Sequence, residues 1–261
     1  MQGDDPREVL TRPAPPPDRT IRYGDHPDQL IDLRLPAAGQ PPRPLVAVIH
    51  GGFWRAAYDR SHTGPLAADL AGRGDPVAQL EYRRTGQPGG GWPGTFDDIA
   101  AAMSMLSDGD WQAPGGDSAL PPVVLGHSAG GHLALWWAGQ PGARVRAVVA
   151  LAPVVDLAAA HRLNLGDGAV AALLGGPPQA WPQRYEAAEP APPPPGTAVT
   201  VVHGDQDQQV PVAFSRRWVA AARARGHSVN LVDLPGVEHF GLIDPRSEAW
   251  LSVTKAIAET G

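Results

Sequence analysis

The sequence predicts a mostly parallel, doubly wound α/β sheet with helices on both faces, and three observations lead to this prediction. From residue 45 onward, short aliphatic runs alternate with segments of helical periodicity. The aliphatic runs are continuous, as in residues 45–49 (LVAVI), which is typical of parallel strands covered on both faces. One such run, residues 123–125, leads through a glycine-rich turn into an apolar helix from residue 132 onward.

The composition favours one domain and excludes several classes of partner. The 261 residues, 43% of them hydrophobic, suffice for one large core, and we expect a single domain over residues 21–261. The net charge is −6 and no block of Lys or Arg occurs, so neither nucleic acid nor a membrane is expected as a partner. Cysteine is absent, which excludes disulfides and thiolate catalysis. No signal peptide or long apolar run is visible, so a cytoplasmic protein is expected.

The N-terminal part is expected to be an arm followed by an edge hairpin. Residues 1–20 are rich in proline and acidic residues, which predicts a flexible arm, either loose or wrapped on the domain. Residues 21–35 alternate apolar and polar positions between turn residues, which predicts an antiparallel hairpin at the edge of the sheet. Further strands are predicted at 45–49, 76–82, 123–125, 145–151, 198–202 and 229–234, and helices at 65–72, 96–106, 132 onward, 212–224 and 247–259.

The segment over residues 152–196 breaks this alternation. It contains two short helical patterns, at 154–161 and 169–174, separated by Gly-Pro turns. Because it is too long for an ordinary connection, we interpret it as a lid-like insertion over the active-site edge. A pair of surface helices with no role in binding is the alternative.

The glycine-rich turn carries the first candidate for chemistry. Residues 126–130 (GHSAG) fit G-x-S-x-G, in which a serine lies on a sharp strand-to-helix turn between small neighbours. Its hydroxyl would project above the carboxyl edge of the sheet, where the next helix directs its first N–H groups. Ser128 is therefore the candidate nucleophile, the alternative being a turn that only joins a strand to a helix.

A serine nucleophile requires a base, and the base requires an acid that orients it. In this kind of fold the order along the chain is Ser, acid, His. His203 precedes the acid candidates, and His227 lies at the amino edge of the sheet. His239 follows the last strand at its carboxyl end, so it is the predicted general base, although a solvated loop histidine is the alternative.

The acid is expected after the strand at 198–202. Asp207 is preferred because it lies deeper in the loop, three residues before Val210 and Pro211 turn the chain into the next helix. Asp205 is expected to hydrogen-bond the backbone of its own turn. Asp156, after the preceding strand, is a third candidate.

An acyl-transfer site also needs N–H donors for the oxyanion. The N–H of Ala129 follows the nucleophile directly. The partners are expected from the loop after the strand at 45–49, where Gly52 and Phe53 are the favoured donors. His50 and His127 are expected to support these loops without taking part in the chemistry.

Five motifs in order, from about residue 23 to the end, resemble the α/β-hydrolase superfamily, and within it the kynurenine formamidase-like and small carboxylesterase group. They are YGDHPDQLIDLRLP, HGGFWR, GHSAGGHLALWWA, HGDQDQQVP and VEHFGLIDP. The resemblance implies an α/β-hydrolase fold, a Ser128–Asp207–His239 triad, and Phe53 and Trp54 beside the substrate pocket, with core packing the alternative for Trp54. The sequence departs from formamidases at Gly241, where they tend to carry Asp. The histidine-rich motif of metal-dependent formamidases is absent, so no metal or other cofactor is expected.

The predicted function is that of a serine hydrolase acting on a small ester or N-formyl aryl amide. Tyr58, Trp92 and Trp181 add aromatic surface that is expected to bind the substrate. A peptidase of the prolyl oligopeptidase type is a second hypothesis, against which no gating domain is present. A ligand-binding module without catalysis is a third, although no triad member is missing. The oligomeric state stays open, with a homodimer as one option.

Overall fold

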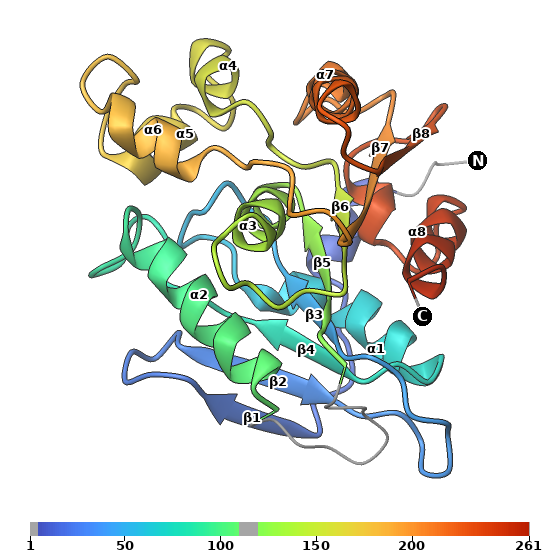
Figure 1. Cartoon of the computed structure of the whole chain (residues 1–261). Helices are drawn as coiled ribbons and strands as arrows, with labels where there is room; N and C mark the ends of the chain where they lie inside the picture. The colour runs from blue at the N-terminus through green and yellow to red at the C-terminus, as the bar shows by residue number, and fades with distance from the viewer. Residues whose placement is uncertain (1–4, 110–119, 261) are drawn as a thin grey trace.

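The computed structural model describes residues 5–109 and 120–260, and it contains one eight-stranded sheet flanked by helices (Figure 1). The strand order is β1-β2-β4-β3-β5-β6-β7-β8. β1 pairs antiparallel with β2 and β2 antiparallel with β4, and all other pairs are parallel, which confirms the predicted fold class. The strands are β1 (Arg19–Arg22), β2 (Leu30–Arg34), β3 (Val46–Ile49), β4 (Val77–Leu80), β5 (Val123–His127), β6 (Ala147–Leu151), β7 (Ala198–Gly204) and β8 (Val229–Leu234).

The position of β3 decides where a ligand can bind. β3 lies between β4 and β5. The chain runs from β3 to β4 on one side of it and then crosses to β5 on the other side, so the direction in which strands are added reverses at β3. In open parallel sheets, such a reversal leaves a crevice at the carboxyl ends of the two adjacent strands. Here those strands are β3 and β5, which end at Ile49 and His127. The HGGFW loop and the serine turn therefore emerge side by side.

Helices cover both faces of the sheet (Figure 1). One face carries α2 (Gly94–Ser107), α3 (Ala129–Ala138) and α7 (Val212–Ala224), whose apolar residues belong to one core cluster. The other face carries α1 (Gly64–Gly72) and α8 (Ala249–Ala258), which belong to a second cluster. All ten residues of α3 are buried, which explains why its sequence is apolar on every side. None of the helices in residues 5–109 and 120–260 is long and apolar enough to cross a bilayer.

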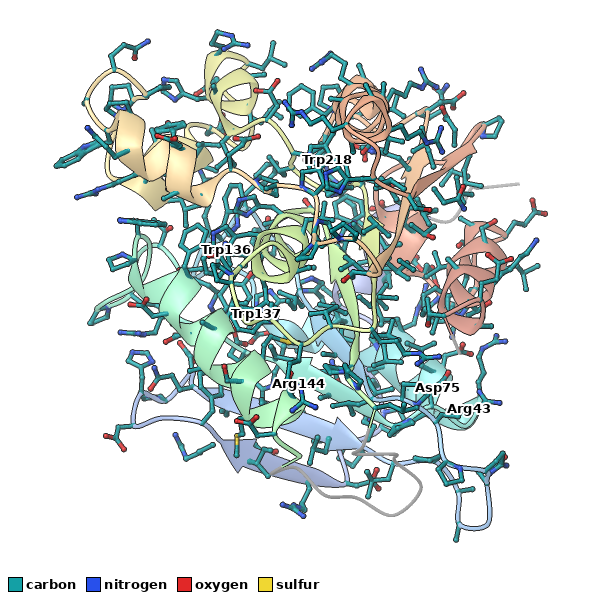
Figure 2. The ribbon with its side chains drawn as sticks, viewed as in Figure 1. Arg43, Asp75, Trp136, Trp137, Arg144 and Trp218 are labelled. Atoms are coloured by element: carbon teal, nitrogen blue, oxygen red, sulfur yellow. The ribbon has the colours of Figure 1, made fainter. Side chains whose placement is uncertain are left out.

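The insertion forms three short helices, α4 (Leu157–Arg162), α5 (Ala169–Leu174) and α6 (Pro182–Ala188). The sequence predicted the first two but not α6. Two tryptophans tie the end of the insertion to the domain (Figure 2). Trp136 of α3 donates to the Ala187 carbonyl at 2.9 Å, and Trp218 of α7 donates to the Pro190 carbonyl at 3.0 Å.

Three 3-10 helices were not predicted either: η1 (Pro6–Leu10), η2 (Arg60–Thr63) and η3 (Phe240–Ile243). They are too short for a periodic signal. The first lies in the segment that we expected to be a flexible arm. From residue 5 this segment is wrapped against the domain, and Val9 is fully buried in the second core cluster.

Candidate active site

The serine turn has the strained geometry that a nucleophile elbow requires. Ser128 lies between β5 and α3 with φ 56° and ψ −117°, a conformation that a non-glycine residue rarely adopts. Its N–H donates to the Leu151 carbonyl at 2.8 Å, which holds the turn against β6. A Cβ at Gly126 would overlap the Gly130 carbonyl, and one at Gly130 would overlap the Ile49 carbonyl. The small residues therefore permit the close approach of three backbone segments around Ser128.

A carboxylate and an imidazole from two other loops meet beside this turn. Asp207 follows β7 and His239 follows β8, and His239 Nδ1 lies 2.6 Å from Asp207 Oδ2. The other carboxylate oxygen accepts the N–H groups of Gln209 at 2.7 Å and Val210 at 2.8 Å. Because the carboxylate accepts a hydrogen bond from Nδ1–H, the lone pair of a neutral His239 lies on Nε2. That is the tautomer a general base needs.

His203 adds a further donor to the same carboxylate. This fully buried residue at the end of β7 places Nε2 3.2 Å from Asp207 Oδ2 and 3.0 Å from the Val210 carbonyl oxygen. Its Nδ1 lies 2.7 Å from Ser215 Oγ on α7. Burial by itself raises the pKa of Asp207, but the hydrogen bonds from His203 and His239 outweigh this effect and hold the pKa well below its usual range. Asp207 is therefore an ionised carboxylate at neutral pH.

The alternative candidates have structural partners elsewhere. Asp205 is exposed and accepts the Gly236 N–H at 2.8 Å, so it joins its loop to the turn after β8 and not, as we expected, to the backbone of its own turn. Asp156 accepts the Ala159 N–H at 2.8 Å and begins α4. His227 lies just before β8, at the opposite edge of the sheet from Ser128.

A cavity of about 190 Å³ joins these elements. Both Ser128 and His239 line it, and so do Gly52 and Phe53 of the loop after β3. The remaining lining residues come from the N-terminal segment, from the residues around η2, from the end of β5 and from the loops that carry the acid and the base: Arg7, Leu10, Tyr58, His62, His127, Gln209 and Phe240.

The loop after β3 turns sharply beside Ser128. Gly52, Phe53 and Trp54 have φ values of 103°, 51° and 55°, three consecutive left-handed residues that turn the backbone sharply. A Cβ at Gly52 would overlap the Tyr58 side chain. On the other side of Ser128, Ala129 is the first residue of α3, so its N–H has no acceptor within the helix. These are the N–H groups that the sequence predicted as oxyanion donors.

His50 anchors this loop from the core. Its Nδ1 lies 2.8 Å from the Gly51 carbonyl oxygen and its Nε2 lies 2.9 Å from Glu81 Oε1, with the side chains of His50 and Glu81 both buried. Both ring nitrogens therefore face oxygen acceptors. The ring stacks on Tyr82, with centroids 4.4 Å apart. Burial raises the pKa of Glu81, but its interactions with His50, with Arg84 and with the Arg60 N–H together outweigh this effect, so the net shift is downward.

Two more histidines line the cavity in neutral form. Burial, together with the neighbouring His50, lowers the pKa of His62 to about 4. Burial also holds the pKa of His127 well below its usual range, with the neighbouring His239 acting in the same direction. His127 Nε2 lies 3.1 Å from the His239 carbonyl oxygen, so this ring supports the backbone of the predicted base.

The predicted substrate-binding residues divide into two groups. Phe53 and Tyr58 line the cavity. Trp54 is fully buried in the core against the His132 ring, whereas Trp92 packs on Phe96 and Trp181 stacks under the Arg184 guanidinium. None of these three tryptophans belongs to the cavity lining. Their positions therefore support a structural role.

The insertion supports the site from the side. None of the described residues in 152–196 lines the cavity. Instead, Gly166 lies so close to Phe53 that a Cβ there would meet the phenyl ring at 2.6 Å, and Arg55 donates to the carbonyls of Gly166 and Asp167. The insertion thus packs behind the loop after β3 and holds Phe53 in place.

Some lining residues carried no sequence signal. Arg7 and Leu10 lie in the segment expected to be a flexible arm, and His62 lies in a short 3-10 helix. Phe240 directly follows His239, so its proximity alone was a usable signal. Among residues 5–109 and 120–260, no group of three or more His, Cys, Asp or Glu is arranged to hold a metal ion.

The sheet, the serine elbow and the loop order together define an α/β-hydrolase of the carboxylesterase-like class. Three solved esterases share the fold over nearly the whole chain. They are a truncated carbohydrate esterase from gut microbiota (TM-score 0.77, 20% identity, 95% of this chain and 98% of that one), a thermophilic esterase from Thermogutta terrifontis (0.74, 21%, 96% and 95%) and esterase B from Lactobacillus rhamnosis (0.77, 20%, 98% and 89%).

The family follows from the sequence itself. The BD-FAE family model matches residues 31–221, and the chain belongs to that family. Two curated relatives match over 44% of this chain. They are a probable isoprenylcysteine alpha-carbonyl methylesterase from Oryza sativa subsp. japonica, 35% identical over 27% of its length, and a kynurenine formamidase from Danio rerio, 29% identical over 36% of its length. The chain thus matches only about a third of each relative's length.

Proposed function

We propose that this protein is a serine hydrolase that cleaves a small carboxylic ester or an N-formyl aryl amide through an acyl-enzyme. The observation that carries the proposal is the 2.6 Å contact between His239 Nδ1 and the buried Asp207, next to a cavity that His239 shares with Ser128. A strained serine, an oriented imidazole and a nearby loop of N–H donors are the parts that acyl transfer requires.

The reaction proceeds in two halves. Ser128 Oγ attacks the substrate carbonyl carbon while His239 Nε2 takes the hydroxyl proton, and the oxyanion accepts N–H bonds from Ala129 and from Gly52 or Phe53. The bond from carbonyl carbon to the leaving oxygen or nitrogen then breaks as His239 returns its proton to the leaving group. Water enters, gives a proton to His239 and attacks the acyl-enzyme, and the free acid leaves as Ser128 regains its proton. Asp207 stays ionised throughout and orients the ring.

The size and lining of the cavity indicate the class of substrate. At about 190 Å³ the cavity is smaller than the pockets of roughly 300 Å³ or more that hold drug-sized ligands. Phe53, Tyr58 and Phe240 provide aromatic surface, and the lining contains no Asp or Glu. The methylesterase and the kynurenine formamidase among the relatives are consistent with a small acyl group on either an ester or an aryl amide.

Covalent labelling tests the nucleophile. A fluorophosphonate probe is expected to label the wild-type protein and Ser228→Ala, an exposed serine-to-alanine control, but not Ser128→Ala. Labelling of Ser128→Ala at the wild-type level would assign the nucleophile to another residue. Absence of labelling in all three proteins would favour the ligand-binding module.

A substrate panel tests the reaction. p-Nitrophenyl esters of two to twelve carbons are run beside N-formylkynurenine, and Ser128→Ala is the control for uncatalysed hydrolysis. We expect turnover of the shortest esters, of N-formylkynurenine or of both. A strong preference for N-formylkynurenine would identify a formamidase, and turnover of esters alone would identify a carboxylesterase.

A further inference from the structure

The N-terminal segment over residues 5–18, here called the N-terminal strap, is seated on the domain by side chains built to receive it. Arg34 of β2, only 7% exposed, donates to the carbonyls of Pro15 at 2.6 Å and Pro16 at 3.2 Å. Asp18 donates its N–H to the Leu33 carbonyl at 2.9 Å and accepts the Leu35 N–H at 2.8 Å. Because proline has no N–H group, Pro15 and Pro16 leave no buried backbone donor unpaired when Arg34 binds their carbonyls.

The strap's other end is held near the catalytic loops. Arg12 forms a two-pronged ion pair with Asp244, directly after η3, with one contact at 3.0 Å between Nη2 and Oδ2. Val9 is fully buried in the core that includes α1 and α8. Asp5 accepts the Arg7 N–H at 2.9 Å and so begins η1. The strap is therefore anchored along its length, and the burial of Val9 fixes which side of η1 faces the domain.

Two strap residues lie at the catalytic cavity. Val9 is buried in the core, whereas Arg7 and Leu10, which are three residues apart in η1, line the cavity. Leu10 packs on the same core cluster as Phe240, the residue that follows the proposed base. The Arg7 guanidinium lies 6.0 Å from the centre of the Phe240 ring. The strap thus forms part of the wall around Ser128 and His239.

We propose that the N-terminal strap is a specificity element, in which Leu10 limits the size of the substrate group that fits beside Ser128. This inference rests on the proposed hydrolase function and names the substrate class more narrowly: esters or amides whose group in the cavity is short. In a cavity of about 190 Å³, a substrate group that is one methylene longer than the space allows fits only if a lining side chain moves. The side chain that moves, or that blocks the group, sets the maximum length of the substrate group. Leu10 is the aliphatic residue of the lining, and we assign this role to it.

The test compares chain-length profiles of Leu10 variants. kcat/KM is measured for p-nitrophenyl esters of two to twelve carbons, and for acetate esters of alcohols of increasing length, so that either half of the substrate is covered. In Leu10→Ala the ratio of octanoate to acetate, or of octyl to methyl acetate, is expected to rise about tenfold over wild type, the size of a pocket misfit of one or two methylenes. Leu10→Trp is expected to lower the butyrate-to-acetate ratio.

The control is Leu251→Ala, which truncates a leucine that is 68% exposed on α8 and absent from the cavity lining. Its profile is expected to match wild type. Fluorophosphonate labelling of every variant separates the two proposals. An unchanged profile in Leu10 variants that fold, label and turn over acetate overturns the role of the strap alone. Failure of wild-type protein to label or to hydrolyse any ester or amide overturns the proposed function, and this inference with it.

Discussion

The two sides of Ser128 are built by different means. On one side, the loop after β3 is proposed to supply backbone N–H donors, and its shape depends on three consecutive left-handed residues held by the buried His50–Glu81 pair. On the other side, the loops after β7 and β8 present side chains, and their alignment depends on hydrogen bonds that converge on Asp207. Backbone donors need a fixed chain, whereas a proton-transfer pair needs a fixed tautomer.

The comparison teaches which kind of substitution each side tolerates. A side-chain change at the acid–base loops removes a chemical group and leaves the backbone in place. At the loop after β3, adding a single carbon at Gly52 is expected to displace the proposed donors themselves. The predictions below test this difference, starting from the largest expected effect.

Loss of the proposed base is expected to have the largest effect. His239→Ala removes the group that accepts the proton of Ser128, so kcat should fall by roughly four orders of magnitude or more with little change in Tm. The matched control is His227→Ala, at the opposite edge of the sheet. Turnover of p-nitrophenyl acetate by His239→Ala at near the wild-type rate would remove His239 from the mechanism.

The second prediction breaks the other side by adding one carbon. Gly52→Ala places a Cβ against Tyr58 at a φ of 103°, so the loop must shift. Its N–H groups would then no longer point to the proposed oxyanion position. We expect kcat/KM to fall about a hundredfold, the typical effect of one lost oxyanion donor. Gly39→Ala is the control, because φ there is 87° and no atom lies within 4 Å of the added Cβ. Equal kinetics for the two variants would contradict the assigned role of the loop.

A smaller effect is expected at His203, which acts through Asp207. His203→Leu removes one hydrogen-bond donor to the buried carboxylate of Asp207. Such a bond typically contributes about 1.5–3 kcal/mol, and we expect only part of this loss to raise the activation free energy. kcat should fall about tenfold with KM unchanged, and His203→Gln, which retains an N–H donor, should restore most of the rate. If a lower Tm explained the lower activity, or if kcat fell equally in His203→Leu and His203→Gln, His203 would have only a packing role.

The smallest effect on catalysis is expected at the insertion, outside both sides of the site. Burial raises the pKa of Glu189 from 4.5 to about 7, while its carboxylate accepts the Leu157 N–H at 2.9 Å. Since the folded pKa is above the unfolded one, the contribution of Glu189 to stability is present below pH 4.5 and is lost as the pH rises from there to 7.

Glu189→Gln should remove this loss, because the amide keeps an acceptor without a charge. We expect the variant to be more stable than wild type by about 1–3 kcal/mol at pH 8 and equal to it at pH 4, with kcat unchanged. Urea unfolding at the two pH values provides the measurement. A variant less stable than wild type at pH 8 would show that the charged form is the favoured one.

The fold class and the location of the site were predictable from the sequence because their signals are local. Aliphatic runs and helical spacing predicted the sheet, and G-x-S-x-G identified the turn at Ser128. Chain order and position after a strand were enough to select Asp207 and His239, which the structure places 2.6 Å apart. Their catalytic role remains the proposal above.

The walls of the cavity were not predictable in the same way. The aromatic residues proposed to bind substrate were chosen by type, and Trp54, Trp92 and Trp181 pack elsewhere. The strap's proline content resists regular structure, so its sequence left open whether it is loose or wrapped on the domain, and did not indicate where it docks. Its seat depends on contacts such as Arg12 with Asp244, residues 232 positions apart.

The sequence by itself determined the order of strands and helices, the strained serine turn and the types of residue available for acid and base, because backbone preference and hydrophobic periodicity act over a few residues. Only the tertiary structure decided which N-terminal residues border the cavity, that His203 faces Asp207, and that the insertion lies behind Phe53 with none of its described residues lining the cavity. Except for His203 and Asp207, which are four residues apart, these contacts join segments far apart along the chain, so they exist only once the sheet has brought the segments together.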